Sequence, residues 1–339
     1  MSNLPPSGEI PRGAIRFNTD SNKPELWDGS QWAEFQLSTP NLGESGDTQP
    51  GARGFFNGGQ ESPTTTVNKI EYINIASTGD AVDFGDLTRN AKNAAACASS
   101  VTGIVAGGES SNDIIEKYTI ASTGSCVDSG GNLSAGTQYS SGLSNSTRGI
   151  IALSYVSNAN VDTLEYITIS SIGNSVDFGN LQSARRASAA CASPTRGLFA
   201  GGIGPSGVNT IDFVTIATLG DAQDFGDLLN TQWDGAGLSN PTRGLWGGGA
   251  TPTNISTIQY VNISSGGNSV KFGDLTSTRR QTAGCSSSIR GVWGGGETPS
   301  FIDTIEYVNI TTEGDAVDFG NLSSNRTWIV GCSNAHGGL

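Results

Sequence analysis

Charged residues are scarce in this chain, and the residue types that catalysis uses most are scarcer still. Of 339 residues, 14% are charged, and there are one histidine, one methionine and five cysteines. The single histidine, His336, lies three residues from the end, so a Ser-His-Asp or Cys-His nucleophile system would have to be built there. The sequence argues against such an enzyme, although a glycosidase that uses two carboxylates stays open.

Other features that define protein classes are also absent. No apolar run reaches the ~18–20 residues of a membrane helix, and residues 1–13 contain no apolar stretch that could serve as a secretory signal. No segment has a convincing 3.6-residue apolar period, so helix should be nearly absent. The net charge of −13 argues against non-specific binding to nucleic acid or anionic membranes, which both need basic residues.

A repeat occupies most of the chain. The residues GDAVDFGDL at 79–87 return as GDAVDFGNL at 314–322, 235 positions later. The shared phrase recurs with gaps of 94, 47, 47 and 47 residues at Phe84, Phe178, Phe225, Phe272 and Phe319. The copy missing from the long gap is VDSGGNL at 127–133, where Ser129 replaces phenylalanine. The chain therefore contains six copies of a 47-residue unit.

Each copy predicts four short strands. In the fourth copy the apolar or β-branched segments are residues 187–193, 198–202, 210–217 and 222–228. A four-stranded sheet of this size cannot bury both faces alone, but six sheets packed radially can. The C-terminal segment 327–332 matches the first strand of a copy, so it should complete the first blade and remove an open edge. The sequence predicts an all-β, six-bladed propeller over residues 51–339.

Glycine pairs, a tyrosine-containing strand and a final aromatic residue make the repeat similar to the kelch repeat. In the last copy these residues are Gly295, Gly296, Tyr307 and Phe319. The resemblance covers roughly residues 47–339. Kelch repeats usually carry tryptophan where this chain carries phenylalanine. The resemblance implies a propeller but no particular activity, because such propellers include both enzymes and binding modules.

Residues 1–37 differ from the repeats and predict a small separate module. Residues 13–35 read as a three-strand meander that is too small to bury a core alone, so it should dock on another protein or on its own copies. Residues 38–50 have the composition of a linker. The module resembles one found in structural proteins of tailed bacteriophages, especially fibres and adhesins. The matching residues are Gly13, Ile15, Arg16, Asn18, Thr19, Asp20, Trp27, Asp28, Gly29 and Trp32, and the expected attachment residues are Ile15, Phe17, Trp27 and Trp32.

Recurring cysteines and aspartates are interpreted as structural. Cys97, Cys191, Cys285 and Cys332 share one repeat position with Leu143 and Leu238, which predicts buried core thiols; Cys126 stands outside the pattern. The CxxC spacing typical of zinc sites is absent. Aspartates such as Asp80, Asp83 and Asp86 suit turns and strand edges, with Ca²⁺ binding as the alternative. We expect no cofactor and no metal site.

The loops between second and third strands differ among copies, whereas the turns between third and fourth strands are uniform. One regular rim and one diversified rim are typical of a loop-borne binding surface. The expected binding residues on this face are Trp233, Arg185, Arg279, Tyr155 and Phe301, since aromatic and arginine side chains are frequent anchors. The arginines have a structural alternative, which is bonding to loop carbonyls and aspartates. Residues 126–160 depart from the repeat, through drift or because they form a partner groove.

These resemblances predict a virion structural protein of a tailed phage, exposed on the particle. The leading hypothesis is a tail fibre or receptor-binding adhesin. Its module would bind other virion proteins, and its propeller loops would bind a host surface glycan or envelope protein. Several copies on one particle, or a homo-oligomer, would strengthen weak binding. The alternatives are a capsid or tail decoration protein with an architectural role and a glycan-cleaving virion enzyme. Nucleic-acid binding and membrane insertion are not expected.

Overall fold

The structure, a computed structural model, describes residues 11–18, 23–27, 29–34, 51–109 and 112–339. The chain divides into two units, residues 1–47 and residues 48–339. Almost all regular structure in the described residues is strand, and the helical exception among them is the short 3-10 turn η2 (Ile169–Ser171). None of the described residues belongs to a helix long and apolar enough to cross a membrane.

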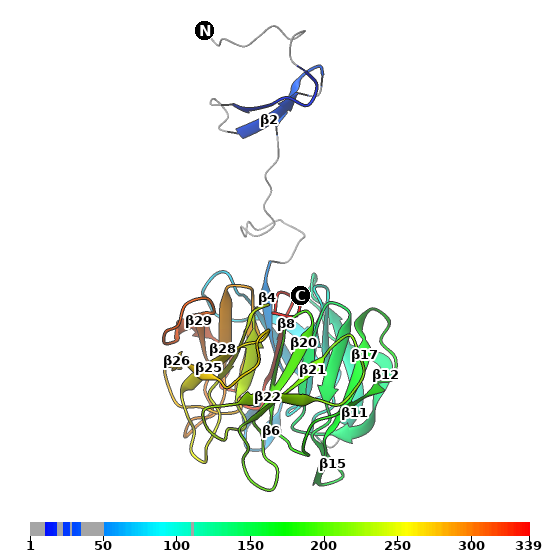
Figure 1. Cartoon of the computed structure of the whole chain (residues 1–339), viewed down its shortest axis with the longest axis vertical. Coiled ribbons are helices and arrows are strands. Elements are labelled where there is room, and N and C mark those ends of the chain that lie inside the picture. The colour runs from blue at the N-terminus through cyan, green and yellow to red at the C-terminus, as the bar shows by residue number, and fades with distance from the viewer. Residues whose placement is uncertain (1–10, 19–22, 28, 35–50, 110–111) are drawn as a thin grey trace. The chain divides into compact units, whose positions relative to one another are not determined.

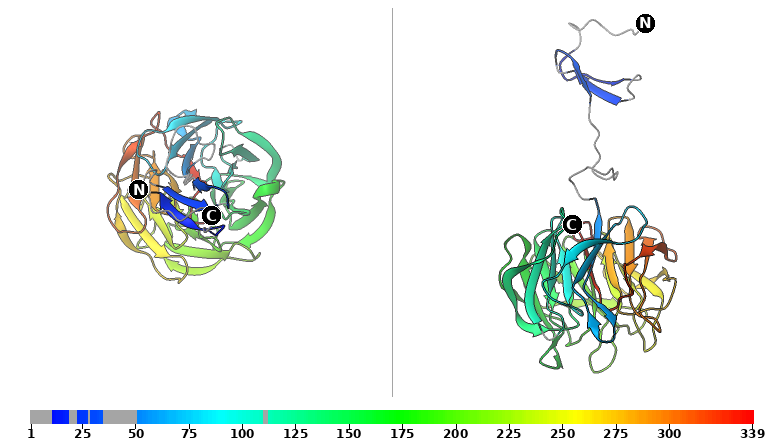
Figure 2. Two further views of the ribbon diagram at one scale, coloured as in Figure 1. Left: turned by 90° about the horizontal axis from the view of Figure 1, so that it is seen from above. Right: turned by 180° about the vertical axis from the view of Figure 1, so that it is seen from behind.

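The second unit is a six-bladed β-propeller, which confirms the predicted fold class (Figures 1 and 2). Each blade is an antiparallel sheet of four strands, ordered below from the innermost strand outward. Blade 1 contains β31 (Val330–Ser333), β4 (Arg53–Asn57), β7 (Lys69–Asn74) and β8 (Val82–Asp86). Blade 2 contains β9 (Ala95–Ala98), β10 (Thr102–Ala106), β11 (Asn112–Thr119) and β12 (Val127–Thr137). Blade 3 contains β13 (Ser141–Ser144), β14 (Arg148–Ala152), β17 (Thr163–Thr168) and β18 (Val176–Asn180).

The remaining blades repeat the same arrangement with few changes. Blade 4 contains β19 (Ala189–Ala192), β20 (Arg196–Ala200), β21 (Thr210–Thr215) and β22 (Gln223–Asp227). Blade 5 contains β23 (Ala236–Ser239), β24 (Arg243–Gly247), β25 (Thr257–Asn262) and β26 (Val270–Asp274). Blade 6 contains β27 (Ala283–Ser286), β28 (Arg290–Gly294), β29 (Thr304–Asn309) and β30 (Val317–Asn321). Two hairpins extend loops of blades 1 and 3: β5 (Gln60–Ser62) with β6 (Thr65–Thr66), and β15 (Tyr155–Val156) with β16 (Ala159–Asn160).

The hydrophobic core lies between blades, because the second strand of each blade buries both of its faces. In β4, Phe55 packs into the cluster shared with blade 2, while its neighbour Phe56 packs into the cluster shared with blade 6. Six such clusters, one at each blade interface, hold the described propeller residues together. A single sheet could not bury both rows of side chains, so each blade depends on its two neighbours to bury them.

The innermost strands contact one another around the axis and are lined by very small residues. Their shared position holds Ala96, Gly142, Ala190, Gly237, Gly284 and Gly331. A Cβ atom added at Gly237 would lie 2.5 Å from the carbonyl oxygen of Ala190 in the preceding blade. Larger side chains would force the blades apart, so these residues allow a narrow central channel.

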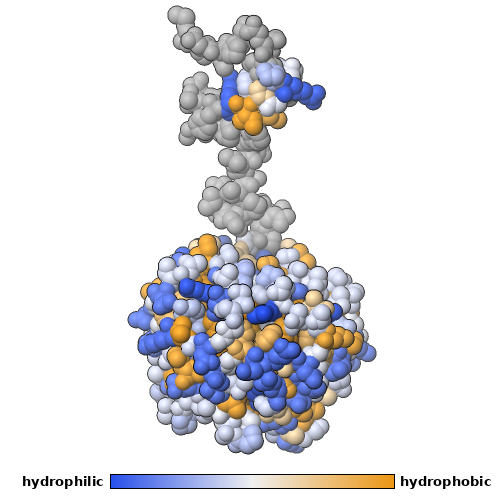
Figure 3. Space-filling view, in the orientation of Figure 1, coloured by the Kyte–Doolittle hydropathy of each residue, from blue (hydrophilic) through white to orange (hydrophobic). Residues whose placement is uncertain are grey.

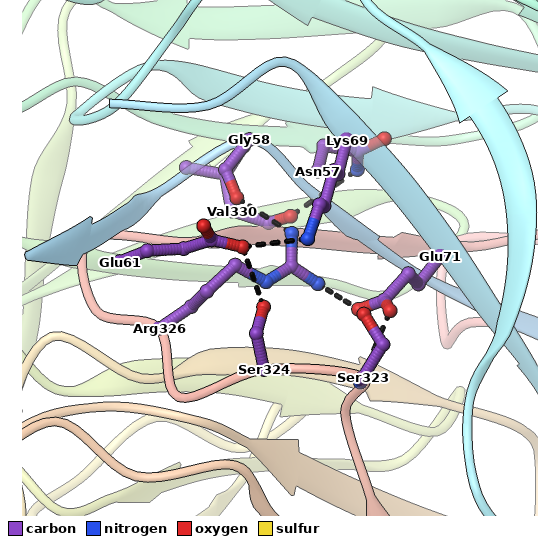
Figure 4. Close-up of polar contacts among 9 residues, drawn as sticks. All are labelled: Asn57, Gly58, Glu61, Lys69, Glu71, Ser323, Ser324, Arg326 and Val330. Atoms are coloured by element: carbon purple, nitrogen blue, oxygen red, sulfur yellow. Dashed lines mark hydrogen bonds and ion pairs between the residues drawn. The ribbon is translucent and has the colours of Figure 1, made fainter. Parts of the chain in front are cut away.

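The ring is closed by the C-terminal strand, as the sequence predicts. β31 pairs antiparallel with β4, with Val330 opposite Asn57 and Ser333 opposite Gly54. Just before β31, the buried Arg326 forms an ion pair with Glu71 of blade 1 and donates a 2.9 Å hydrogen bond to Gly58 O (Figure 4). The two ends of the repeat array are therefore joined by a strand pairing and by a buried charge pair.

The propeller has two distinct faces. The loop face carries the connections from second to third strands and from each blade to the next. The turn face carries the short turns from first to second and from third to fourth strands. On the turn face, Gly51 O accepts a hydrogen bond from Asn334 Nδ2, and Arg53 N donates one to Asn334 Oδ1. The propeller segment therefore begins on the turn face. The visible surface mixes hydrophilic and hydrophobic residues (Figure 3).

The N-terminal unit contains the predicted three strands, β1 (Ile15–Asn18), β2 (Lys23–Trp27) and β3 (Trp32–Glu34), in sheet order β1-β2-β3. Trp27 is buried, and its ring centroid lies 5.4 Å from that of Trp32. The guanidinium of Arg16 lies 4.2 Å from the Trp32 ring and pairs with Glu25. Ile15 is 68% exposed. The side chain of Phe17 and the proposed linker 38–50 lie outside the described residues.

Candidate functional site

Six equivalent positions on the loop face adopt the left-handed backbone conformation without being glycine. Each lies two residues before the start of an innermost strand, and each φ lies between 55° and 59°. The six residues, in ring order, are Asn93, Tyr139, Ala187, Asp234, Gln281 and Trp328. We call them the inner ring. A non-glycine residue in this conformation costs roughly 1–2 kcal/mol, although asparagine and aspartate tolerate it better.

A belt of backbone hydrogen bonds holds the inner ring in place. The amide of Asp234 donates to Ala187 O at 3.1 Å, and the amide of Trp328 donates to Gln281 O at 3.1 Å. The same kind of main-chain hydrogen bond joins every neighbouring pair of ring residues. Between Tyr139 and Asn93 the donor is Ser140 N, which bonds to Asn93 O. The belt uses main-chain atoms, so the backbone geometry does not depend on which side chains occupy the ring.

The inner ring surrounds a pocket of about 120 Å³ at the mouth of the central channel. All six ring residues line it, together with small residues of the innermost strands and hydroxyl-bearing residues such as Ser140, Ser188 and Thr282. The pocket therefore combines six different ring side chains with a narrow floor that is nearly the same in every blade.

Part of the pocket wall is aromatic. The rings of Tyr139 and Trp328 lie 5.4 Å apart at an interplanar angle of 72°, and both are half-buried. Tyr155 extends the group, with its centroid 5.9 Å from that of Tyr139. Tyr155 comes from the β15–β16 hairpin, within the stretch where the repeat pattern breaks. The irregularity at this blade thus supplies an aromatic residue next to the pocket.

The wall also has polar residues: Asn93 lies between Trp328 and Tyr139 in the ring order, and Asp234 lies across the ring from it. Asn93 is 7% exposed, and its Oδ1 atom has no hydrogen-bond partner among the described residues. The carboxylate of Asp234 accepts a long hydrogen bond of 3.4 Å from Gln281 Nε2. Burial raises the pKa of Asp234 to about 6, against the opposing effects of Gln281, Arg280 and Arg186.

Two arginines lie near Asp234. The guanidinium of Arg186 lies 5.1 Å from the Tyr155 ring and 5.8 Å from the Tyr139 ring, and it donates a 3.0 Å hydrogen bond to Asn160 Oδ1. Arg280 forms an ion pair of 3.3 Å with Glu297. The negative charge of Asp234 is therefore set between two positive groups.

The C-terminal tail closes the channel on the turn face. His336 Nε2 donates to Ala98 O at 2.8 Å, and Gly338 N donates to Nδ1 at 3.0 Å, which makes the ring the neutral Nε2–H form. Burial lowers the pKa of His336, consistent with that form. A Cβ atom at Gly337 would lie 2.4 Å from Asn240 O. The tail fills its space closely, so the pocket opens on the loop face.

The prediction that Arg185 and Arg279 are surface anchors is wrong, because both side chains are fully buried between blades. Arg185 lies 3.0 Å from Asp212, and Arg279 forms an ion pair with Glu306. Both arginines instead have the alternative, structural role, in which they bond to carbonyl oxygens and acidic side chains. Within each doublet, the partly exposed member at the pocket rim is the second arginine, Arg186 or Arg280.

The three aromatic residues expected at the binding face all lie in loop-face segments, and each is half-buried. Tyr155 contacts Tyr139 of the pocket, as described above. Trp233 precedes Asp234 and packs over Gly207, where an added Cβ would meet the indole ring at 2.6 Å. Phe301 forms a backbone bridge with Glu297, which is the ion-pair partner of Arg280. The structure thus brings Tyr155 to the pocket, while Trp233 and Phe301 lie in neighbouring loops.

The recurring cysteines, aspartates and turn arginines have packing and bonding partners. All five thiols are buried and none forms a disulfide. Asp221 Oδ1 accepts a 2.9 Å hydrogen bond from Asn180 N, which links the outer edges of blades 3 and 4. Arg196 donates to Ile263 O in the next blade at 3.0 Å and stacks on Phe213. The described residues contain no group of three His, Cys, Asp or Glu side chains that could hold a metal ion.

Comparison with known proteins gives no family for this chain: no family model and no curated protein matches it.

Sequence reasoning missed the inner ring, because the variation at its position does not stand out from that of its neighbours. When the six copies are aligned, one position just before the innermost strand holds Asn, Tyr, Ala, Asp, Gln and Trp. The adjacent positions vary almost as much, with Lys, Gln, Arg, Trp, Arg and Thr before it and Ala, Ser, Ser, Gly, Thr and Ile after it. Only the structure shows that this position has a left-handed backbone and that all six copies meet around one pocket.

Proposed function

We propose that this chain is a virion protein of a tailed phage, a tail fibre or receptor-binding protein whose propeller binds a component of the host surface through its loop face. The observation that carries the proposal is the inner ring. Six equivalent positions in a repetitive framework hold six different residues around one pocket, in a backbone conformation that glycine would adopt at least cost. Retaining side chains at such positions suits recognition better than packing.

The phage assignment rests on the N-terminal unit. Its sequence resembles a module of phage fibre and adhesin proteins, and the exposed Ile15 beside the Arg16–Trp32 pair suits a contact with another virion protein. The kelch-like character of the repeats is supported by the glycine pairs that end second strands and by Tyr–Phe pairs such as Tyr307 and Phe319, whose rings lie 5.8 Å apart. Because the propeller segment begins on the turn face, the loop face is free of this covalent connection.

The pocket is better suited to binding than to hydrolysis. A carboxylate glycosidase needs two acidic groups on either side of the bond it breaks. Among the described residues that line the pocket, Asp234 is the one that carries a carboxyl group. The architectural alternative would cover the loop face with other virion proteins, and it would give the pocket no use for an unpaired acceptor at Asn93.

Immunogold electron microscopy tests the proposal. Antibody against residues 51–339 is applied to intact particles from the source of the protein. Label at the distal end of the tail or its fibres is the expected result. Label over the head or along the tail shaft would favour the decoration role instead, and particles without label would refute the virion assignment altogether.

A further inference from the structure

The wall of the pocket within the inner ring combines aromatic rings with hydrogen-bond acceptors, and this combination defines the kind of ligand it fits. We propose that it binds one neutral sugar unit at the end of a surface glycan. An apolar face of the sugar ring would stack on Tyr139 and Trp328, while its hydroxyl groups donate to Asn93 and Asp234. This inference rests on the proposed function and names the ligand class of the same site.

The unmet acceptors require a ligand that donates hydrogen bonds. Asn93 Oδ1 is buried without a partner among the described residues, and leaving such an atom unsatisfied costs about 1–3 kcal/mol. Asp234 accepts one hydrogen bond at the long distance of 3.4 Å. A purely apolar ligand would leave both acceptors without a good donor, whereas sugar hydroxyls can satisfy them.

The aromatic rings of the wall require the same ligand to have an apolar face. Tyr139 and Trp328 each combine an apolar ring face with a polar edge. A pyranose ring carries C–H groups on its faces and hydroxyl groups around its edge. It can therefore contact the aromatic rings and the acceptors at the same time.

Charge argues for a neutral sugar. A cationic ligand would be repelled by Arg186, whose guanidinium lies 5.8 Å from the Tyr139 ring and 5.1 Å from the Tyr155 ring. Arg186 and Arg280 also offset the charge of Asp234. An anionic ligand would meet Asp234 and the unpaired oxygen of Asn93, which both repel it. A ligand without charge avoids both penalties.

Size limits the ligand to one ring. The pocket measures about 120 Å³, which is of the order of the ~150 Å³ cavity that holds benzene in an engineered protein. The tail with Gly337 and Gly338 closes the channel beyond it, so a polymer cannot thread through. Ala187 has the smallest side chain of the inner ring and leaves room at the mouth.

The experiment is a binding titration of the full chain by calorimetry and ligand-observed NMR. The probes are methyl glycosides of hexoses, 6-deoxyhexoses and N-acetylhexosamines, with choline and a methyl uronide as charged comparisons. The variants are Trp328→Ala, Asn93→Gly and Ala187→Trp, which blocks the mouth without removing a polar group. Ala187 itself shows that alanine fits the ring conformation. Leu219→Ser, on an exposed turn of the opposite face, is the matched control, and each variant's melting temperature reports its folding.

We expect at least one neutral glycoside to bind saturably. Trp328→Ala, Asn93→Gly and Ala187→Trp should each weaken it at least tenfold, while Leu219→Ser changes it less than twofold. Binding of only the charged probes, binding of none, or glycoside binding that survives Ala187→Trp in the folded protein would overturn the inference.

Cell binding separates this inference from the proposed function. The same variants are tested for adsorption to cells that the source phage infects. If the unmodified chain and Ala187→Trp adsorb equally well, the sugar pocket is wrong and the adhesin role stands. If the unmodified chain does not adsorb, the adhesin role itself fails.

Discussion

The buried pair of Arg279 and Glu306 can be replaced by a pair of glutamines with little loss of stability, because the propeller contains that replacement at another interface. Each interface places a side chain of the third strand against the preceding blade, where it accepts a hydrogen bond from a backbone amide. Glu306 accepts from Thr276 N at 2.7 Å, and Gln259 at the equivalent position accepts from Leu229 N at 2.8 Å. Gln232 occupies the repeat position that corresponds to Arg279. The side-chain amide of Gln259 donates a hydrogen bond to that of Gln232.

The magnitude follows from the burial of both charges. Either single substitution, Arg279→Gln or Glu306→Gln, leaves one buried charge unpaired, which costs about 3–5 kcal/mol. For a unit the size of residues 48–339, the unfolding entropy is about 0.6 kcal/mol/K, so each kcal/mol changes the melting temperature by about 1.6 °C. Each single variant should therefore melt about 5–8 °C lower. The double variant regains a neutral bonded pair and should melt within about 3 °C of the unmodified protein.

Differential scanning calorimetry of the four proteins measures this coupling. Arg280→Gln serves as the control, because Arg280 is partly exposed and its pair with Glu297 should contribute less than about 1 kcal/mol. If the double variant loses the sum of the two single losses, the two side chains act independently and the reasoning from the Gln232–Gln259 interface is wrong.

Three further predictions concern Asp234, the thiols and the tail. Asp234 has a folded-state pKa of about 6, above its ordinary value of 3.8, so its contribution to stability is present below about pH 4 and is lost as the pH rises through 6. Asp234→Asn should therefore raise the melting temperature at pH 8 and change it little at pH 4; equal shifts at both pH values would contradict this. Burial raises the pKa of Cys97, Cys191 and Cys285, so Ellman's reagent should label no thiol in the native protein and all five in guanidinium, and rapid native labelling would refute the burial. Gly337→Ala should lower the melting temperature by several degrees, because its Cβ would meet backbone oxygens 2.4–2.5 Å away, whereas Leu219→Ser should not.

The fold could be predicted from the sequence because its strongest signal is one that short-range reasoning can detect. Six copies of a strand pattern leave few ways to bury both faces of every sheet, and the match of the C-terminal segment to a first strand specifies the closure. Even the exceptions are consistent. In the last copy Tyr307 packs against Phe319, and the second copy has Lys117 and Ser129 at these two positions. Both members of the aromatic pair are therefore replaced together.

The site could be predicted only in part, because burial at a blade interface depends on the next copy of the repeat. Arg185 and Arg186 are neighbours in the chain and chemically identical. One is buried against Asp212, 27 positions later, and the other lies at the pocket rim beside Tyr155. Strand alternation alone does not identify the outward member, because both arginines belong to a connection rather than a strand.

The inner ring separates two demands that usually conflict in a binding site. The backbone belt and the small residues around the channel support the ring through main-chain contacts, although Gln281 also accepts a buried hydrogen bond from Thr327 Oγ1 at 2.9 Å. Position 187 holds alanine and position 328 holds tryptophan at nearly the same φ, 59° and 56°. A substitution in the ring therefore changes the pocket without changing the backbone that supports it. If the proposed function is right, exchanges among the uncharged residues already found in the ring should alter which surface is recognised while changing the melting temperature less than Asp234→Asn does at pH 8.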